Sequence, residues 1–228
     1  MAYKGFDIDA YPGDTAMSDF WNNTPFSFTG FYLAPAPNHS NTSWMDKKSH
    51  LASLGYGFLP IFVELQAGDS GLSYAQGQSD ASTAANLASQ AGFTSTDDVI
   101  YLDVEQGGLL EQDFIDYIDG WIDYIVNPSI YMPGIYCSYY QTANQIESSS
   151  TNAGNLDNIR YWVFNINQPP SPGCTTDTSD SPGDSGVSYA SSWQYIQSGA
   201  SSGCLQTWNG TSLYVDLNLS NYANPSAG

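Results

Sequence analysis

The sequence predicts an α/β fold, a single (β/α)8 TIM-type barrel whose helices are abbreviated in the last third. Strand-like runs alternate with helix-like segments almost throughout, which is typical of βα units and a parallel sheet. A length of 228 residues fits one barrel. Residues 168–191 are rich in Pro, Ser, Gly, Asp and Thr, and they predict a long loop late in the chain. We therefore expect one domain over residues 1–228.

Eight segments have the composition of strands, and five segments between them have the periodicity of helices. The predicted strands are 5–9, 28–33, 58–65, 99–105, 133–138, 161–165, 192–197 and 214–217. The predicted helices are 15–22, 43–54, 79–91, 110–126 and 139–147. Several of the helices are opened by Ser, Thr or Asp, the side chains that cap helix N-termini.

An open doubly wound sheet is the alternative fold. Such sheets usually carry a Gly-rich phosphate-binding turn after the first strand. Here the first strand is followed by GFDIDAYPGD, which does not match GxGxxG. The sequence therefore favours the closed barrel.

Charge and hydropathy together exclude two classes of partner. The formal net charge is -19, and the only cationic side chains are Lys4, Lys47, Lys48 and Arg160, so nucleic acid is excluded. No apolar run approaches the roughly 20 residues that span a bilayer, so membrane insertion is excluded as well. Abundant Ser, Thr, Asn, Tyr and Gly indicate a secreted, extracellular protein, and we expect any signal peptide to lie outside this chain.

The cysteines and sequons agree with secretion. Cys174 and Cys204 lie in Ser/Gly/Pro-rich segments and predict a disulfide, the alternative being two free surface thiols. Cys137 lies in an apolar strand and predicts a buried free thiol. Five Asn-x-Ser/Thr sequons predict a glycoprotein, at Asn22, Asn38, Asn41, Asn209 and Asn218. Isolated His39 and His50 predict solvated side chains, and we expect neither a metal nor a cofactor.

Two acidic pairs stand at strand ends. Asp103 and Glu105 lie two residues apart in VIYLDVEQ, so both carboxylates leave the same face of one strand, where burial makes charge costly. Asp7 and Asp9 in GFDID have the same spacing, although capping of a turn is the favoured explanation of that pair taken alone. Carboxylates gathered at strand ends indicate acid/base chemistry.

In a barrel of this kind, functional groups lie at the carboxyl ends of the strands. Beyond the two acidic pairs, those ends carry Glu64, Gln66, Tyr136, Tyr139, Tyr140, Asn165, Asn167, Gln194 and Asp216. Tyrosine faces stack on sugar rings, and carboxylates and amides bond to hydroxyls, so this lining suits a carbohydrate. The alternative is that the aromatic residues only close the barrel.

These residues stand in an ordered set of motifs that resembles a known family. GFDIDAYP with Trp21, GFYLA, GFLPIFVELQ, QSDASTAANLASQAGF, IYLDVEQ, WQYIQ and VDLN together resemble the glycoside-hydrolase-like barrels related to family 25 lysozymes. The set is most similar to the family 184 fungal muramidases, and it covers nearly the whole chain.

The resemblance implies a muramidase (lysozyme) that hydrolyses the β-1,4 bond between N-acetylmuramic acid and N-acetylglucosamine in bacterial cell-wall peptidoglycan. It implies Glu105 as general acid/base, Asp103 as the charged partner beside it and Asp7 as the first-strand aspartate. Repulsion from Asp103 and Asp7 is expected to keep Glu105 protonated, with Asp103 ionised. Substrate-binding residues are then expected at Asp9, Glu64, Gln66, Tyr136, Asn165, Gln194 and Asp216. We expect a monomer.

Two other functions stay open, and a third is disfavoured. Family 18 chitinases use DxxDxDxE, and Tyr101 stands here in place of the middle Asp, which weakens the interpretation as a chitinase. A catalytically silent barrel that binds cell-wall glycans would keep the same acids, and the negative surface fits an anionic wall poorly. Clustered carboxylates also suit a metal-dependent hydrolase, which insensitivity to EDTA would remove.

Overall fold

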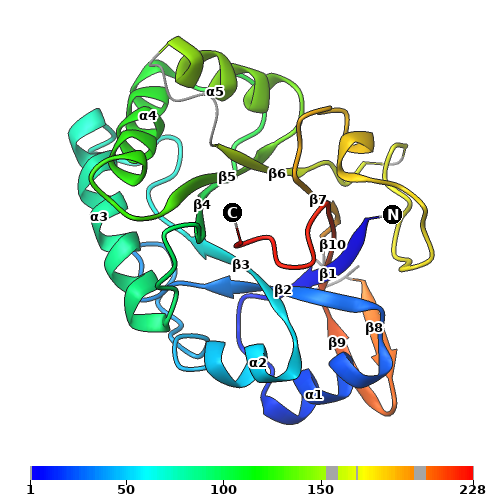
Figure 1. Ribbon diagram of the computed structural model, residues 1–228. Coiled ribbons are helices and arrows are strands. Elements are labelled where there is room, and N and C mark those ends of the chain that lie inside the picture. The colour runs from blue at the N-terminus through cyan, green and yellow to red at the C-terminus, as the bar shows by residue number, and fades with distance from the viewer. Residues whose placement is uncertain (1, 153–158, 168, 198–203, 228) are drawn as a thin grey trace.

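The computed structural model describes residues 2–152, 159–167, 169–197 and 204–227. Within these residues, eight strands close into a barrel in the order β1-β10-β7-β6-β5-β4-β3-β2 (Figure 1). The barrel strands are β1 (Tyr3–Asp7), β2 (Phe26–Tyr32), β3 (Gly57–Phe62), β4 (Val99–Val104), β5 (Met132–Ser138), β6 (Arg160–Phe164), β7 (Ser192–Ile196) and β10 (Asp216–Ser220). The predicted barrel is confirmed.

Helices surround the first five strands (Figure 1). They are α1 (Asp14–Asn23), α2 (Lys48–Leu54), α3 (Tyr74–Ala91), α4 (Gln112–Val126) and α5 (Gln141–Asn152). Local signals set their ends, as in α3, where the Ser73 side chain accepts a hydrogen bond from the Gln76 N–H and Gly92 takes the left-handed conformation. Helix α2 starts five residues after the predicted start, because 43–46 forms turns. None of the described helices is long and apolar enough to cross a membrane.

The last third of the barrel departs from the regular pattern. After β6 the predicted long loop contains only a short 3₁₀ turn, Pro182–Ser185, and no α-helix among its described residues. A two-stranded hairpin that the sequence did not predict, β8 (Leu205–Trp208) with β9 (Thr211–Tyr214), precedes the final strand. Strand β10 runs antiparallel to both β1 and β7. The expectation of a wholly parallel sheet is therefore wrong.

Aromatic side chains fill the inside of the barrel. Phe28, Tyr101, Tyr136 and Trp162 belong to one inner cluster of buried residues, and the Tyr101 and Trp162 rings meet edge to face at 5.9 Å. Glycine makes room for these rings, because a Cβ on Gly134 would lie 2.5 Å from the Tyr101 ring. The outward-facing residues of the same strands pack against the helices in a second, larger cluster.

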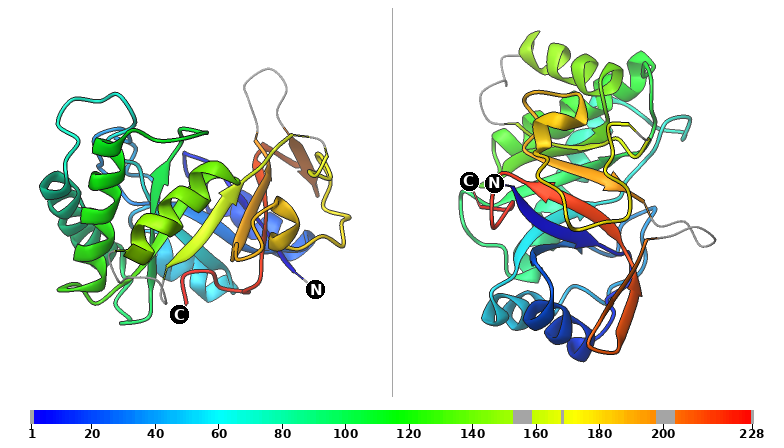
Figure 2. Two further views of the ribbon diagram at one scale, coloured as in Figure 1. Left: turned by 90° about the horizontal axis from the view of Figure 1, so that it is seen from above. Right: turned by 90° about the vertical axis from the view of Figure 1, so that its right-hand side faces the viewer.

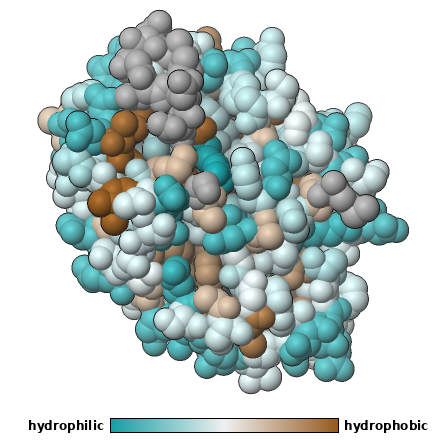
Figure 3. Space-filling view, in the orientation of Figure 1, coloured by the Kyte–Doolittle hydropathy of each residue, from teal (hydrophilic) through white to brown (hydrophobic). Residues whose placement is uncertain are grey.

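The C-terminal segment covers one end of the barrel. The Tyr101 hydroxyl donates to the Pro225 carbonyl at 3.1 Å, and the Asn224 side chain accepts from the Phe58 N–H at 2.8 Å. The N- and C-termini lie on the same side of the molecule (Figure 2), and this covered end has a mostly hydrophilic surface (Figure 3). The carboxyl ends of the parallel strands, and with them the candidate site, lie at the opposite end.

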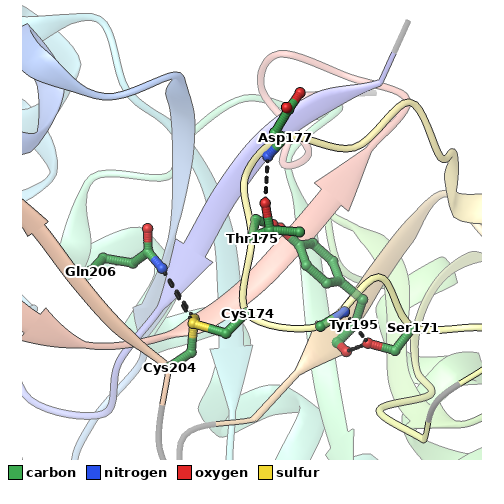
Figure 4. Close-up of a disulfide and its surroundings, with 8 residues drawn as sticks. Ser171, Cys174, Thr175, Asp177, Tyr195, Cys204 and Gln206 are labelled. Atoms are coloured by element: carbon green, nitrogen blue, oxygen red, sulfur yellow. Dashed lines mark hydrogen bonds between the residues drawn. A yellow bond between two sulfur atoms is a disulfide. The ribbon is translucent and has the colours of Figure 1, made fainter.

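The predicted disulfide is confirmed. Cys174 in the long loop and Cys204 before β8 are bonded, with their Cα atoms 5.3 Å apart (Figure 4). The loop is also held to the barrel, because the Tyr195 hydroxyl of β7 donates to the Thr175 carbonyl at 2.8 Å. Cys137 is a buried free thiol, as expected.

Candidate active site

A hydrogen-bonded group of polar side chains surrounds Asp7 at the end of β1. The Asn218 side-chain amide donates to Asp7 Oδ1 at 2.6 Å. The Gln194 amide nitrogen donates to Asp7 Oδ1 and to Asp216 Oδ2, both at 3.1 Å. The Tyr32 hydroxyl donates to Asp7 Oδ2 at 3.4 Å. Asp7 is buried, and strands β1, β2, β7 and β10 all contribute to its surroundings.

The reversed strand explains how Asp216 reaches this place. In an antiparallel strand the first residue, not the last, lies at the open end of the barrel. Asp216 begins β10 and pairs in register with Asp7, the last residue of β1. Its predicted position at the barrel mouth is therefore correct, although the predicted parallel direction of the strand was wrong.

A second layer of contacts orients the amides that face Asp7. Gln194 Oε1 accepts from the Tyr136 hydroxyl at 2.6 Å and from the Gln197 amide at 2.9 Å. Both contacts fix the oxygen, so the Gln194 NH₂ group is directed at the carboxyl groups. In the same way, Asn218 Oδ1 accepts from the Trp162 indole at 2.8 Å. Tyr136 thus orients Gln194, a positioning role.

Strand β4 places the second acidic pair. Asp103 faces the barrel interior, is 5% exposed, and its Oδ1 has no hydrogen-bond partner. Glu105 follows two residues later, beyond the end of the strand, and is exposed. The Gln66 side chain holds the backbone here, since Nε2 donates to the Asp103 carbonyl at 2.8 Å and Oε1 accepts from the Glu105 N–H at 3.0 Å.

Burial and like charge raise the pKa of both buried aspartates. Burial, and then the charge of Asp216, raise the pKa of Asp7 to about 8, despite the hydrogen bonds from Asn218 and Gln194. Burial, and then the charges of Glu105 and Asp7, hold the pKa of Asp103 well above its usual value. Desolvation and the neighbouring carboxylates thus oppose the charge of Asp103, which the sequence analysis expects to be ionised.

Two predicted substrate-binding residues point away from the mouth. Glu64 lies on the outer face of its strand, and burial followed by the charge of Asp80 on α3 raises its pKa to about 8. Asn165 donates to the Ser185 carbonyl at 2.8 Å, beside the 3₁₀ turn outside the barrel. Their placement in the mouth is corrected. Their strands are apolar on both faces, so the sequence pattern did not reveal which face turns inward.

A pocket of about 340 Å³ opens beside Asp7. It is lined by Asp7, Ile8, Asp9, Tyr32, Tyr214 and Asp216. Asp9 is exposed and forms part of the wall, while Tyr214 comes from the unpredicted hairpin and is 58% exposed. His39 was expected in solvent, but it is half-buried and its ring lies 4.8 Å from that of Tyr32.

Sequence reasoning missed four contributors: Tyr32, Gln197, Tyr214 and Asn218. Asn218 had a usable signal, because in VDLN it follows Asp216 by two residues and so shares its face. It was instead counted as a glycosylation sequon, which its complete burial rules out in the folded protein. Tyr32 is the last residue of a strand whose end carries no carboxylate or amide to mark it. Tyr214 lies in a hairpin that no local sequence pattern predicted.

The acids of the mouth are not arranged as a metal centre. Within the described part of the chain, no group of three or more His, Cys, Asp and Glu side chains could hold a metal ion. What the arrangement offers is an exposed carboxyl, Glu105, beside two buried ones, Asp103 and Asp7, next to a pocket with tyrosine walls.

Solved structures of low sequence identity share the fold. An uncharacterized B. stearothermophilus protein is 20% identical with a TM-score of 0.66, covering 96% of this chain and 95% of that one. The Clostridium perfringens spore cortex lytic enzyme SleM is 15% identical with a TM-score of 0.65, covering 96% and 67%. A family GH25 lysozyme from Aspergillus fumigatus is 15% identical with a TM-score of 0.59, covering 100% of both chains.

The sequence itself gives the family. No curated protein shows significant similarity to the chain. Residues 19–171, however, match the family described as "Rv2525c-like, glycoside hydrolase-like domain". This match takes in β2 to β6 and includes Asp103 and Glu105. The chain therefore belongs to the family of Rv2525c-like, glycoside hydrolase-like domains.

Proposed function

We propose that this protein is a secreted lysozyme-type glycoside hydrolase that cleaves the β-1,4 bond between N-acetylmuramic acid and N-acetylglucosamine in peptidoglycan. One observation carries the proposal. Exposed Glu105 stands two residues after Asp103, a buried carboxyl with an unpartnered oxygen, in the mouth that also holds buried Asp7. The free Asp103 oxygen faces the barrel mouth, whereas the equally unpartnered Oε2 of Glu64 lies on the helix side of the barrel wall.

The chemistry assigns a role to each acid. Glu105, open to substrate, donates its proton to the glycosidic oxygen as the bond to the anomeric carbon breaks. Water then adds its hydroxyl to that carbon, and its proton returns to Glu105. The positive charge that develops on the sugar favours ionised Asp103, so this carboxyl stabilises the transition state more than the ground state. Asp7, Gln194 and Asp216 form the adjoining wall and orient the sugar.

The wider setting is part of the same proposal. The solved structures of similar fold include a spore cortex lytic enzyme and lysozymes, which supports bacterial peptidoglycan as the substrate. The Cys174–Cys204 disulfide supports an oxidising, extracellular location. We take residues 1–228 as one catalytic barrel domain that acts as a monomer, with Tyr136, Gln66 and Asp9 near the bound sugar.

Release of reducing ends from purified peptidoglycan tests the proposal. The parent protein is expected to release them, and Glu105→Gln to lower the rate by about 10²- to 10⁴-fold. Asp97→Asn is the control, because Asp97 is also an exposed carboxyl but precedes β4, at the other end of the barrel from Glu105. If the parent releases no reducing ends yet binds the glycan, and Glu105→Gln binds equally, the protein is a glycan-binding barrel instead.

A further inference from the structure

A smaller pocket opens at the barrel mouth beside the end of β5. Its volume is about 180 Å³, and it is lined by Gly108, Ser138, Tyr139, Tyr140 and Gln141. Strand β5 lies opposite β1 in the closed order of the barrel, so this pocket lies across the mouth from Asp7 (Figure 1). Glu105 follows β4, the neighbour of β5, and the same loop continues to Gly108. A glycan that crosses the mouth from Asp7 past Glu105 therefore reaches this pocket.

Hydrogen bonds join the loop that carries Glu105 to helix α5, which begins beside the pocket. The Thr142 hydroxyl donates to the Gly108 carbonyl at 2.7 Å. The Gln145 side chain accepts from the Leu110 N–H at 2.8 Å and donates to the Leu110 carbonyl at 3.0 Å. These bonds fix the loop against the start of the helix, so the pocket is formed before any ligand enters. A preformed pocket binds at a lower entropic cost.

Tyr139 forms the side of the pocket that is attached to the barrel. Its backbone N–H donates to the Phe164 carbonyl at the end of β6, at 3.1 Å. Its ring lies beside Gly186, where an added Cβ would be 3.6 Å from the ring. The neighbouring strand and the 3₁₀ turn thus hold Tyr139 in place, whereas Tyr140 extends further into solvent.

The backbone of Tyr140 adopts a conformation that tyrosine disfavours. Its φ is 59°, in the left-handed region, where Gly, Asn and Asp are the usual residues. Its carbonyl accepts from the Asn144 N–H at 2.9 Å, which makes it the residue that caps α5, a position that favours Ser, Thr, Asn or Asp. Burial does not compensate, because Tyr140 is 60% exposed. Tyrosine at this position therefore costs stability, and such costs are typical of binding sites.

The lining of the pocket suits an uncharged sugar. Tyr139 and Tyr140 are both exposed, so their rings are available to the apolar face of a sugar. Ser138 and Gln141 add a hydroxyl and an amide that can bond to sugar hydroxyl and acetamido groups. None of the described lining residues is charged, whereas the pockets beside Asp7 and beside the start of α4 both carry carboxyl groups. Of the two sugars in peptidoglycan, the uncharged one is N-acetylglucosamine.

We propose that this pocket binds the N-acetylglucosamine that leaves when the glycan is cleaved, and that the Tyr140 ring stacks against it. This inference rests on the proposed hydrolysis. N-acetylmuramic acid then lies over Asp103 and Asp7, on the other side of the cleaved bond. As the bond from its anomeric carbon breaks, the electron pair stays on the 4-oxygen of N-acetylglucosamine, which takes up the proton from Glu105. Tyr140 binds the sugar and thereby selects the leaving group.

Isothermal titration with an N-acetylglucosamine hexamer tests the inference directly. All proteins carry Glu105→Gln to prevent turnover. We expect the hexamer to bind about tenfold more weakly after Tyr140→Asn, and within about twofold of the parent after Tyr140→Phe, which keeps the ring. Tyr3→Asn is the matched control, because Tyr3 is also exposed but begins β1, at the other end of the barrel. Absence of binding to the parent, or equal affinity of Tyr140→Asn and Tyr3→Asn, would overturn the inference.

Thermal stability separates a binding role of Tyr140 from a structural one. Asparagine adopts the left-handed conformation more readily than tyrosine. Tyr140→Asn is therefore expected to raise the midpoint of thermal unfolding by about 2 °C while it weakens binding of the hexamer. A fall in the midpoint would overturn the inference, because the ring would then support the fold, and the loss of affinity would follow from a damaged pocket.

Hydrolysis of peptidoglycan distinguishes this inference from the proposed function. We expect kcat/KM to fall about tenfold in Tyr140→Asn and to be restored in Tyr140→Phe, because the lost stacking weakens binding of the leaving sugar. Equal kcat/KM in the parent and Tyr140→Asn would refute the role of the pocket but leave the hydrolase standing. No cleavage by the parent would refute the hydrolase, and the titration still decides whether the pocket binds N-acetylglucosamine.

Discussion

Two groups of buried carboxyl side chains lie on opposite faces of the barrel wall, and only one of them opens to the outside. The inner group is Asp7 with Asp103, in the barrel mouth beside a pocket. The outer group is Glu64 with Asp80, enclosed between β3, α3 and α4. Burial is the largest cause of the raised pKa in all four residues.

The difference between the groups lies in what surrounds them. In the inner group, Asp7 receives amides that are themselves held in place, Gln194 and Asn218, and lines a pocket that a ligand can enter. Asp80 receives the Tyr117 hydroxyl at 3.0 Å and the Gln76 amide at 2.8 Å, both from the enclosing helices. A raised pKa alone therefore does not mark a catalytic group, and access to substrate has to accompany it.

The comparison is tested most severely by removing one charge from each group. Asp103→Asn is expected to lower kcat on peptidoglycan by about 10²- to 10³-fold, because the developing positive charge loses its stabilising carboxylate. Asp80→Asn should leave kcat within about twofold of the parent, since the hydrogen-bond partners of Asp80, Tyr117 and Gln76, lie on helices α4 and α3. Both variants are assayed after circular dichroism has verified folding. Comparable losses of kcat in the two variants would contradict the separation of inner and outer acids.

The amide support of the inner group gives the next largest effect. Asn218→Ala removes the 2.6 Å bond to Asp7 and leaves the buried Trp162 indole N–H unpaired. We expect the free energy of unfolding to fall by about 3 kcal/mol, as measured by urea denaturation. Asn23→Ala, an exposed change at the end of α1, is the control and should cost little. A cost below about 1 kcal/mol for Asn218→Ala would mean that the inner network is loosely held.

The pH dependence of stability tests the outer group, through Glu64. The folded-state pKa of Glu64 is about 8, above its ordinary value of 4.5, so the folded protein binds this proton more tightly than the unfolded chain. The resulting stability is fully present below pH 4.5 and is lost as the pH rises through about 8. Between these two pH limits, the free energy of unfolding of Glu64→Gln should therefore fall by about 2 kcal/mol less than that of the parent.

Denaturation of the parent and of Glu64→Gln across this pH range measures the effect. Glu147→Gln is the matched control, a carboxyl on α5 outside both groups. The idea fails if the parent becomes more stable as the pH rises from acid to neutral while Glu64→Gln follows the same curve.

The smallest expected effect concerns the Tyr117 hydroxyl. Tyr117→Phe removes one hydrogen bond to Asp80 while keeping the ring, so unfolding should become easier by about 1 kcal/mol. Activity on peptidoglycan is expected to be unchanged, which calorimetry and the reducing-end assay measure together. A drop in kcat from this change would link the outer group to catalysis after all.

Much of the barrel was predictable because its signals are local. All eight predicted strands lie within a few residues of observed barrel strands, since apolar runs and turn residues mark them in the sequence. The direction of the last strand and the hairpin β8–β9 were not predictable, because both depend on strand partners that the local sequence does not specify. Cys174 and Cys204 were predictable as a pair because both lie in polar, loop-like segments.

The candidate site was predictable where the sequence shows which side chains of a strand share a face. In VIYLDVEQ the pairing of Asp103 with Glu105 follows from the two-residue period of a strand, whatever the rest of the chain does. The predicted placement of Glu64 and Asn165 was wrong because their strands are apolar on both faces, so the sequence does not show which face turns inward. Tyr32 and Tyr214 were missed since neither belongs to a motif, and only the pocket brings them together.

The sequence by itself determined the alternation of strands and helices, the spacing of the acidic pairs and the scarcity of cations, because each of these is set by neighbouring residues or by composition. Only the tertiary structure decided that Asp7 and Asp216 share one amide donor, that Glu64 faces the helices, and that Asp103 is buried with a free oxygen. Those properties depend on which face of each strand turns inward when the sheet closes, and closure brings together residues far apart in the chain.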